Sequence, residues 1–298
     1  MATKAQDKSL PQDKAGANET RMQQKMGMTA EETAYMRGDK HPVAGSIPMS
    51  TSPYLNSPLF VHAFTRMALR RHGDDVAVTY DIPDMSRGLA DVADYRTAME
   101  GLEIEKASNP ALADFLERRP RHEYRADDLQ DYGAGTLGAA IRAFIDRTGY
   151  DLAFVNKGAD DQNDLQYLIK RFGDCHDVQH IATGFHPNLA GELALSIMNV
   201  TCNAKHFNPK LAHFLSQPNI FVSSASYART AFNYPEGTDV TLEAMERGIA
   251  AGRAINKPLI LVEWENYLDW QLEDIARDLG FVMGPGHGWD FSNECCRG

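Results

Sequence analysis

Two histidines and two acidic residues lie close together in the middle of this chain. The segment RFGDCHDVQHIATGFHPNLAGELAL, residues 171–195, carries His176, Asp177 and His180, and eleven further residues separate His180 from Glu192. Imidazole nitrogens and carboxylate oxygens are common ligands of Zn, Fe, Mn and Co. These four residues are therefore candidate ligands of one divalent metal ion, and a coordination position left open would take water or substrate.

Helical spacing predicts that both imidazoles point the same way. A helix beginning near residue 163 has apolar residues at positions 165, 169 and 172, and the same face continues to His176 and His180. Residues four apart on a helix point in the same direction. Two glycines and a proline in TGFHPNLAGE should end this helix, so we expect the chain to return with Glu192 in the first turn of the next one.

The composition is that of an ordinary folded, acidic protein. Hydrophobic residues make up 43% of the 298 positions and charged residues 24%, which argues against a disordered or fibrous chain. The net charge of −11 disfavours a nucleic-acid partner, because phosphate binding needs clustered Lys and Arg.

No apolar run reaches the roughly 18 residues that would indicate a transmembrane helix. The N-terminus is not a secretory signal, and the few cysteines, without a CxxC pair, indicate reduced thiols in a cytosolic protein.

Helix signals predict an all-α protein. In NPALADFLERRP, Asn109 is a typical N-cap and Pro110 suits the first helical position; in GTLGAAIRAFIDRTG, Thr136 is a cap and Gly149 a stop. No alternating pattern is long enough to predict a sheet. We therefore expect a single, mainly helical domain over residues 58–282.

The two ends of the chain have a different composition. Residues 1–57 are rich in polar residues, and HPVAGSIPMSTSPYLNSP at their end holds four prolines, which predicts a flexible N-terminal extension. GPGHGWDFSNECCRG, close to the C-terminus, predicts a loose tail over residues 283–298.

The spacing of the candidate ligands resembles a known family signature. The pattern His-Asp-x-x-His, eleven residues and Glu is that of the fourth coenzyme Q (ubiquinone) biosynthesis protein, the Coq-four family. This chain carries it at His176, Asp177, His180 and Glu192. Flanking residues that also match are Arg171, Gly184 and Gly191. Together with the neighbouring helices, the resemblance covers about residues 65–282.

The resemblance implies an all-helical protein with a bound divalent metal that works in ubiquinone assembly. The implied reaction is oxidative decarboxylation of a polyprenylated aromatic ring, in which a hydroxyl replaces the carboxyl at C1. The implied location is cytoplasmic and peripheral at the inner membrane surface, in association with other ubiquinone-biosynthesis proteins, and a homodimer is allowed. We further expect Arg171 to contact the substrate carboxylate, since a guanidinium matches that group in a bidentate pair.

Three other interpretations stay open at the level of sequence. The protein could be a non-catalytic scaffold that binds a prenyl lipid and keeps its metal for structure. It could be a paralogue that acts on another small molecule. It could also be a hydrolase, since His-Asp-x-x-His is similar to the His-Glu-x-x-His of zinc peptidases. Whether the metal keeps an exchangeable position discriminates a catalytic metal from a structural one.

Overall fold

The described part of the chain is built from helices. The computed structural model describes residues 51–71, 78–121, 123–150, 152 and 161–293, and within them it contains no strand; a single isolated bridge pairs Thr136 with Gln271. The predicted all-α class is therefore confirmed. The predicted extension, residues 1–57, falls outside the described residues up to position 50. Its last part forms the short helix α3 (Pro53–Asn56), because Pro53 is well suited to a first helical position.

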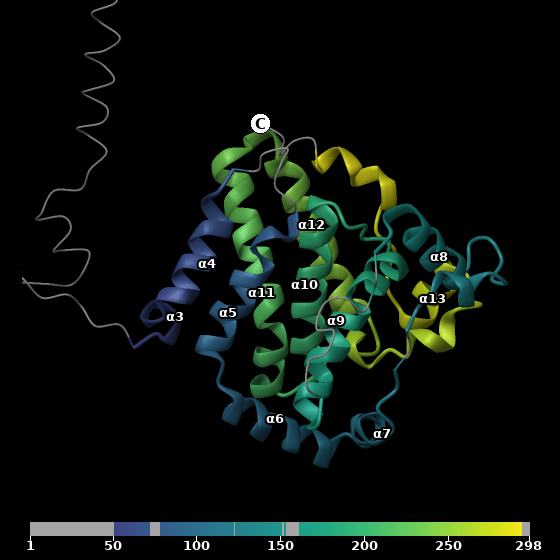
Figure 1. Cartoon of the computed structure of the whole chain (residues 1–298), viewed down its shortest axis with the longest axis horizontal. Helices are drawn as coiled ribbons and strands as arrows, with labels where there is room; N and C mark the ends of the chain where they lie inside the picture. Colours follow the sequence, from purple (N-terminus) through teal and green to yellow (C-terminus); the bar gives the residue numbers. More distant parts are fainter. Residues whose placement is uncertain (1–50, 72–77, 122, 151, 153–160, 294–298) are drawn as a thin grey trace, which may run out of the picture. The chain divides into compact units, whose positions relative to one another are not determined.

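The elements follow one another in the order shown in Figure 1. The further α-helices are α4 (Pro58–Leu69), α5 (Ile82–Val92), α6 (Tyr95–Ser108), α7 (Pro110–Arg118), α8 (Leu137–Thr148), α9 (Asp164–Thr183), α10 (Leu189–His206), α11 (Pro209–Asn233), α12 (Thr238–Ala254) and α13 (Leu272–Leu279). The 3₁₀ helices are η1 (Val78–Asp81), η2 (Ala126–Leu129), η3 (Pro235–Gly237), η4 (Leu259–Leu261), η5 (Trp264–Tyr267) and η6 (Gly286–Asn293).

The predicted caps begin and end the helices as expected. The Asn109 side chain accepts a hydrogen bond from the Leu112 N–H at the start of α7, and Thr136 accepts one from the Ala139 N–H at the start of α8. α8 ends at Gly149, which has a φ of 68°. Such side chains satisfy N–H groups that have no partner within the helix, so these boundaries follow from local sequence.

Helix α10 lies at the centre of the main core. It packs closely against α12 and α11 (Figure 1). α9 packs against α8, α13 and η4. The contact between α10 and α12 depends on two glycines of α12. A Cβ at Gly248 would lie 2.4 Å from the Ala194 carbonyl oxygen, and a Cβ at Gly252 would lie 2.6 Å from that of Met198. Both distances are far below van der Waals contact, so the two helix backbones touch directly.

The C-terminal segment packs onto the domain, which corrects the predicted loose tail over residues 283–298. Trp289 is 3% exposed and its ring stacks on that of Phe185, with centroids 6.0 Å apart. Ser292 is fully buried and accepts a hydrogen bond from the Ala190 N–H. This packing could not be predicted from the sequence GPGHGWDFSN, because its turn residues resemble those of a linker. The burial depends on tertiary contacts. Residues 294–298 lie outside the described residues.

We expect Trp289→Ala to destabilise the protein by about 3 kcal/mol, because it removes a large buried aromatic side chain and leaves a cavity. Urea unfolding followed by circular dichroism measures the change. Phe291→Ala is the matched control: that ring is half exposed, and we expect a change within about 0.5 kcal/mol. A small loss of unfolding free energy in both variants would show that the C-terminal segment does not pack as described.

Candidate metal centre

Three of the four predicted ligands meet at one point. The ligand atoms of His176, His180 and Glu192 all lie within 4.8 Å of one another. The distance from His180 Nε2 to Glu192 Oε1 is 3.3 Å, that from His176 Nε2 to Glu192 Oε2 is 3.7 Å, and that between the two Nε2 atoms is 3.2 Å. All three side chains thus direct their donor atoms toward a common centre.

The α9–α10 turn brings Glu192 to the histidines. α9 ends at Thr183, and the Gly184 that follows has a φ of 71°, a left-handed conformation that favours glycine. α10 then begins after Asn188, whose side chain accepts a hydrogen bond from the Gly191 N–H at 2.8 Å. Glu192 lies in the first turn of α10, as predicted, where the positive end of the helix dipole favours a carboxylate.

The second histidine is held in one ring orientation. His180 is fully buried, and its Nδ1 hydrogen bonds to the Phe185 carbonyl oxygen at 2.5 Å. A carbonyl oxygen can only accept, so Nδ1 carries the hydrogen, and a neutral ring then has its lone pair on Nε2, toward the centre. A ring fixed through its other nitrogen is the usual arrangement of metal-binding histidines.

In His176, the first histidine, the Nδ1 atom is buried and has no hydrogen-bond partner in the described structure. The side chain of His176 is 32% exposed and that of Glu192 is 26% exposed, so the cluster can be reached from solvent. The fixed imidazole of His180, a second imidazole, a carboxylate and a solvent-accessible side suit a divalent ion that keeps an open position.

The pKa values of Glu192 and His176 depend on each other's charge. Burial acts to raise the pKa of Glu192, but the charge on His180 and hydrogen bonds from both histidines outweigh it and hold this pKa far below its usual range. Burial likewise disfavours the charged form of His176, yet the hydrogen bond to Glu192 and its negative charge raise the pKa of His176. The two shifts have opposite directions because the carboxylate and the imidazoles lie in contact.

Asp177 is the predicted ligand that the structure does not bring into this group. It follows His176 directly, so it lies about 100° further round α9, and its side chain is short. Burial raises its pKa, and the positive charges of the two histidines partly offset that rise. Asp177 thus influences the cluster through its charge, and the geometry gives it no place among the candidate ligands.

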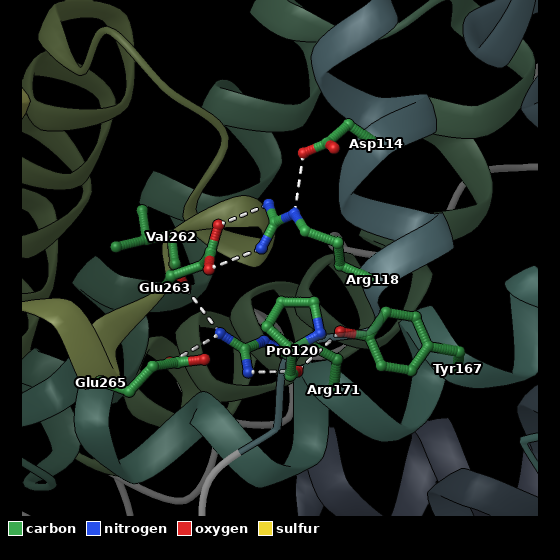
Figure 2. Close-up of polar contacts among 8 residues, drawn as sticks. All are labelled: Asp114, Arg118, Pro120, Tyr167, Arg171, Val262, Glu263 and Glu265. Carbon is green, nitrogen blue, oxygen red and sulfur yellow. Dashed lines mark hydrogen bonds and ion pairs between the residues drawn. The ribbon is translucent and has the colours of Figure 1, made fainter.

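Arg171 lies inside the fold among internal partners (Figure 2). Its guanidinium donates to the Pro120 carbonyl oxygen at 2.9 Å and to the Val262 carbonyl oxygen at 2.8 Å, and its Nη2 is 3.3 Å from a carboxylate oxygen of Glu265. The Tyr167 hydroxyl donates to the same Pro120 oxygen. The side chain is 3% exposed.

These contacts do not support the predicted role of Arg171 in binding a substrate carboxylate. Its Nη groups already have partners, and burial leaves little access to solvent. The helical spacing of position 171 fitted a contact near the cluster, but spacing alone cannot tell which side chains the C-terminal half of the chain will cover. Arg171 instead joins α9 to the segments around Pro120 and Val262.

A second group of candidate ligands, His186, His287 and Asp290, was not predicted from the sequence. His186 lies in the loop that follows α9, and the other two belong to the segment that we expected to be loose. A pattern of one histidine and one aspartate three residues apart, HGWD, is the single sequence signal for it, and that signal is weak.

Comparisons with known proteins agree with the resemblance seen in the sequence. The model of the family "Coenzyme Q (ubiquinone) biosynthesis protein Coq4" matches residues 84–285. The mitochondrial ubiquinone biosynthesis protein COQ4 of Meyerozyma guilliermondii is 25% identical over 206 residues, which cover 66% of this chain and 60% of that protein. The mitochondrial COQ4 homologue of Homo sapiens is 30% identical over 117 residues, covering 38% and 43% of the two chains.

The fold is also similar to a solved structure. A crystal structure of a Nostoc punctiforme protein, described as a ubiquinone biosynthesis protein, aligns with a TM-score of 0.57 over 76% of this chain and 98% of that one, at 20% identity. This similarity concerns the fold alone. The matches span about 60% or less of the length of the first curated relatives. Within the described residues, none of the helices combines the length and apolar character that crossing a membrane requires.

We expect Arg171→Met to lower the free energy of unfolding by about 3 kcal/mol or more, because it leaves buried carbonyl and carboxylate oxygens without their donor. Guanidinium chloride unfolding measures this. Arg118→Met is the control, since Arg118 is paired with Glu263 and Asp114 at the surface and should matter much less. Similar stabilities of the two variants would contradict an internal role for Arg171.

Proposed function

The chain belongs to the family of coenzyme Q (ubiquinone) biosynthesis protein Coq4, and from that membership we propose that it binds one divalent metal ion through His176, His180 and Glu192 and uses it in ubiquinone assembly. The observation that supports this proposal best is the convergence of the three ligand atoms. Zn, Fe, Mn and Co all suit two imidazoles and a carboxylate.

Each residue of the cluster has a distinct task in this proposal. When bound, the ion would act as a Lewis acid that stabilises negative charge on substrate oxygens. His180 would hold it through Nε2, in the orientation set by the Phe185 carbonyl. Glu192 would supply the neutralising carboxylate. His176, at the solvent-accessible side, would complete the ligand set and border the position open to substrate.

The reaction that we propose is the exchange of a ring carboxyl for a hydroxyl on a polyprenylated aromatic acid. It is a two-electron oxidation of the ring carbon that releases CO₂. With dioxygen as oxidant, one oxygen atom enters the hydroxyl and the other leaves as water, with two protons and two electrons from a reductant. The solvent-accessible side of the cluster favours such a role over a purely structural ion, since structural sites are usually closed by four protein ligands.

We extend the proposal to the place of action. A prenylated substrate resides in a lipid bilayer, so the protein would work at the inner membrane surface and in contact with other enzymes of ubiquinone assembly. The relatives named above are described as mitochondrial. Peripheral attachment is consistent with a described part that lacks a membrane-spanning helix.

We expect His180→Ala to lower the metal content of the purified protein by one equivalent per chain, because it removes a buried ligand. Elemental analysis by mass spectrometry measures this, and circular dichroism confirms that the variant is folded. His213→Ala serves as the control, since His213 hydrogen bonds to Tyr54 and Gln217 away from the cluster. Equal metal in all three proteins would refute the proposed ligands.

We expect Glu192→Gln to fold normally but to stop conversion of the carboxylated ring. The amide keeps the shape of the side chain and removes its charge, so metal affinity should fall at least about tenfold. The readout is complementation of cells that lack their own copy, with mass spectrometry of the accumulated carboxylated precursor. Glu246→Gln, an exposed acid on α12, is the control and should restore ubiquinone. Full ubiquinone with a metal-free Glu192→Gln protein would instead support the scaffold interpretation.

A further inference from the structure

A second cluster of ligand-type side chains lies where the C-terminal segment crosses the α9–α10 turn. The ligand atoms of His186, His287 and Asp290 all lie within 4.8 Å of one another. The rings of His186 and His287 meet edge to face, with centroids 4.6 Å apart. His287 Nδ1 is 2.8 Å from a carboxylate oxygen of Asp290.

The backbone holds these three residues together. η6 places His287 and Asp290 on the same side, because a 3₁₀ helix has three residues per turn. Two hydrogen bonds join the C-terminal segment to the turn, from the Gly284 N–H to the Thr183 carbonyl oxygen at 2.8 Å and from the Gly286 N–H to the Gly184 carbonyl oxygen at 3.0 Å. They fix His287 opposite His186, independently of any ion.

The carboxylate of Asp290 is oriented from both sides. One oxygen contacts His287, and the other accepts a hydrogen bond from the Asn188 side-chain amide at 3.1 Å. The Asn188 side-chain oxygen is at the same time fixed by the Gly191 N–H at the start of α10. A hydrogen bond that orients a carboxylate in this way is what metal-binding carboxylates commonly have.

From this geometry we propose that His186, His287 and Asp290 form a second divalent-metal site, of the zinc type, which clamps the C-terminal segment to the α9–α10 turn. Two imidazoles and one carboxylate are a ligand set of Zn²⁺, and the exposure of His287 and Asp290 leaves room for solvent ligands. This site does not depend on the function proposed for the first cluster, with which it shares no residue.

The test is a Zn²⁺ titration of the full-length protein against a chromophoric chelator, followed by dialysis and elemental analysis. We expect two equivalents for the wild type, one for His287→Ala and one for Asp290→Asn. His180→Ala should keep the second equivalent, and His213→Ala should keep both. If His287→Ala and Asp290→Asn both still bind two equivalents of Zn²⁺, the proposal is overturned. If His180→Ala still binds two equivalents, the ligands proposed for the first cluster are wrong and the second site is unaffected.

Hydrogen exchange supplies a second readout, which follows the C-terminal segment itself. Zn²⁺ should slow amide exchange across residues 284–293 at least about tenfold in the wild type and in His180→Ala, because the clamp holds this segment closed. The same segment should show no response to Zn²⁺ in His287→Ala. A response that persists in that variant would overturn the proposal.

The two cysteines that follow in the sequence, Cys295 and Cys296, require their own control, because thiolates bind Zn²⁺ well. The doubly substituted Cys295→Ser, Cys296→Ser protein should keep both equivalents and the protection of residues 284–293. If this protein loses the second equivalent while His287→Ala keeps it, the thiolates are the ligands and the proposed site is wrong.

Discussion

The reversal of the chain between α9 and α10 is the constraint on which the cluster of His176, His180 and Glu192 depends. Four residues, 185–188, separate the left-handed Gly184 from the first residue of α10, and they must return the chain so that Glu192 faces both histidines. Gly191 makes so short a return sterically possible, since a Cβ there would lie 1.9 Å from the His186 carbonyl oxygen. The geometry of the cluster is thus largely a property of the turn.

The C-terminal segment supports this turn from outside. Trp289 stacks on Phe185, the residue whose carbonyl orients His180. Asn293 and Ser292 accept hydrogen bonds from the first N–H groups of α10, at Leu189 and Ala190. These N–H groups have no partner within the helix. The segment therefore stabilises both the ring orientation of a histidine and the start of the helix that carries Glu192.

Local chemistry made much of this structure predictable, and long-range contacts made the rest unpredictable. The caps at Asn109 and Thr136, and the common face of His176 and His180, depend on neighbours within one or two helical turns. The internal role of Arg171 depends on Val262, far along the chain, which no helical period reveals. The same limit applies to the C-terminal segment: glycines and prolines predict turns, but they do not tell whether a turn lies against a core or in solvent.

The direct backbone contact between α10 and α12 has a consequence for how this protein can diverge. The two glycines of α12 are four residues apart, as are the two carbonyl groups of α10 that they meet, so each helix fits the other in one axial position. Any side chain at position 248 or 252 would push α10 and α12 apart, and α10 carries Glu192. Substitutions in α12 would thereby alter the geometry of the cluster of His176, His180 and Glu192 without changing any of these three residues.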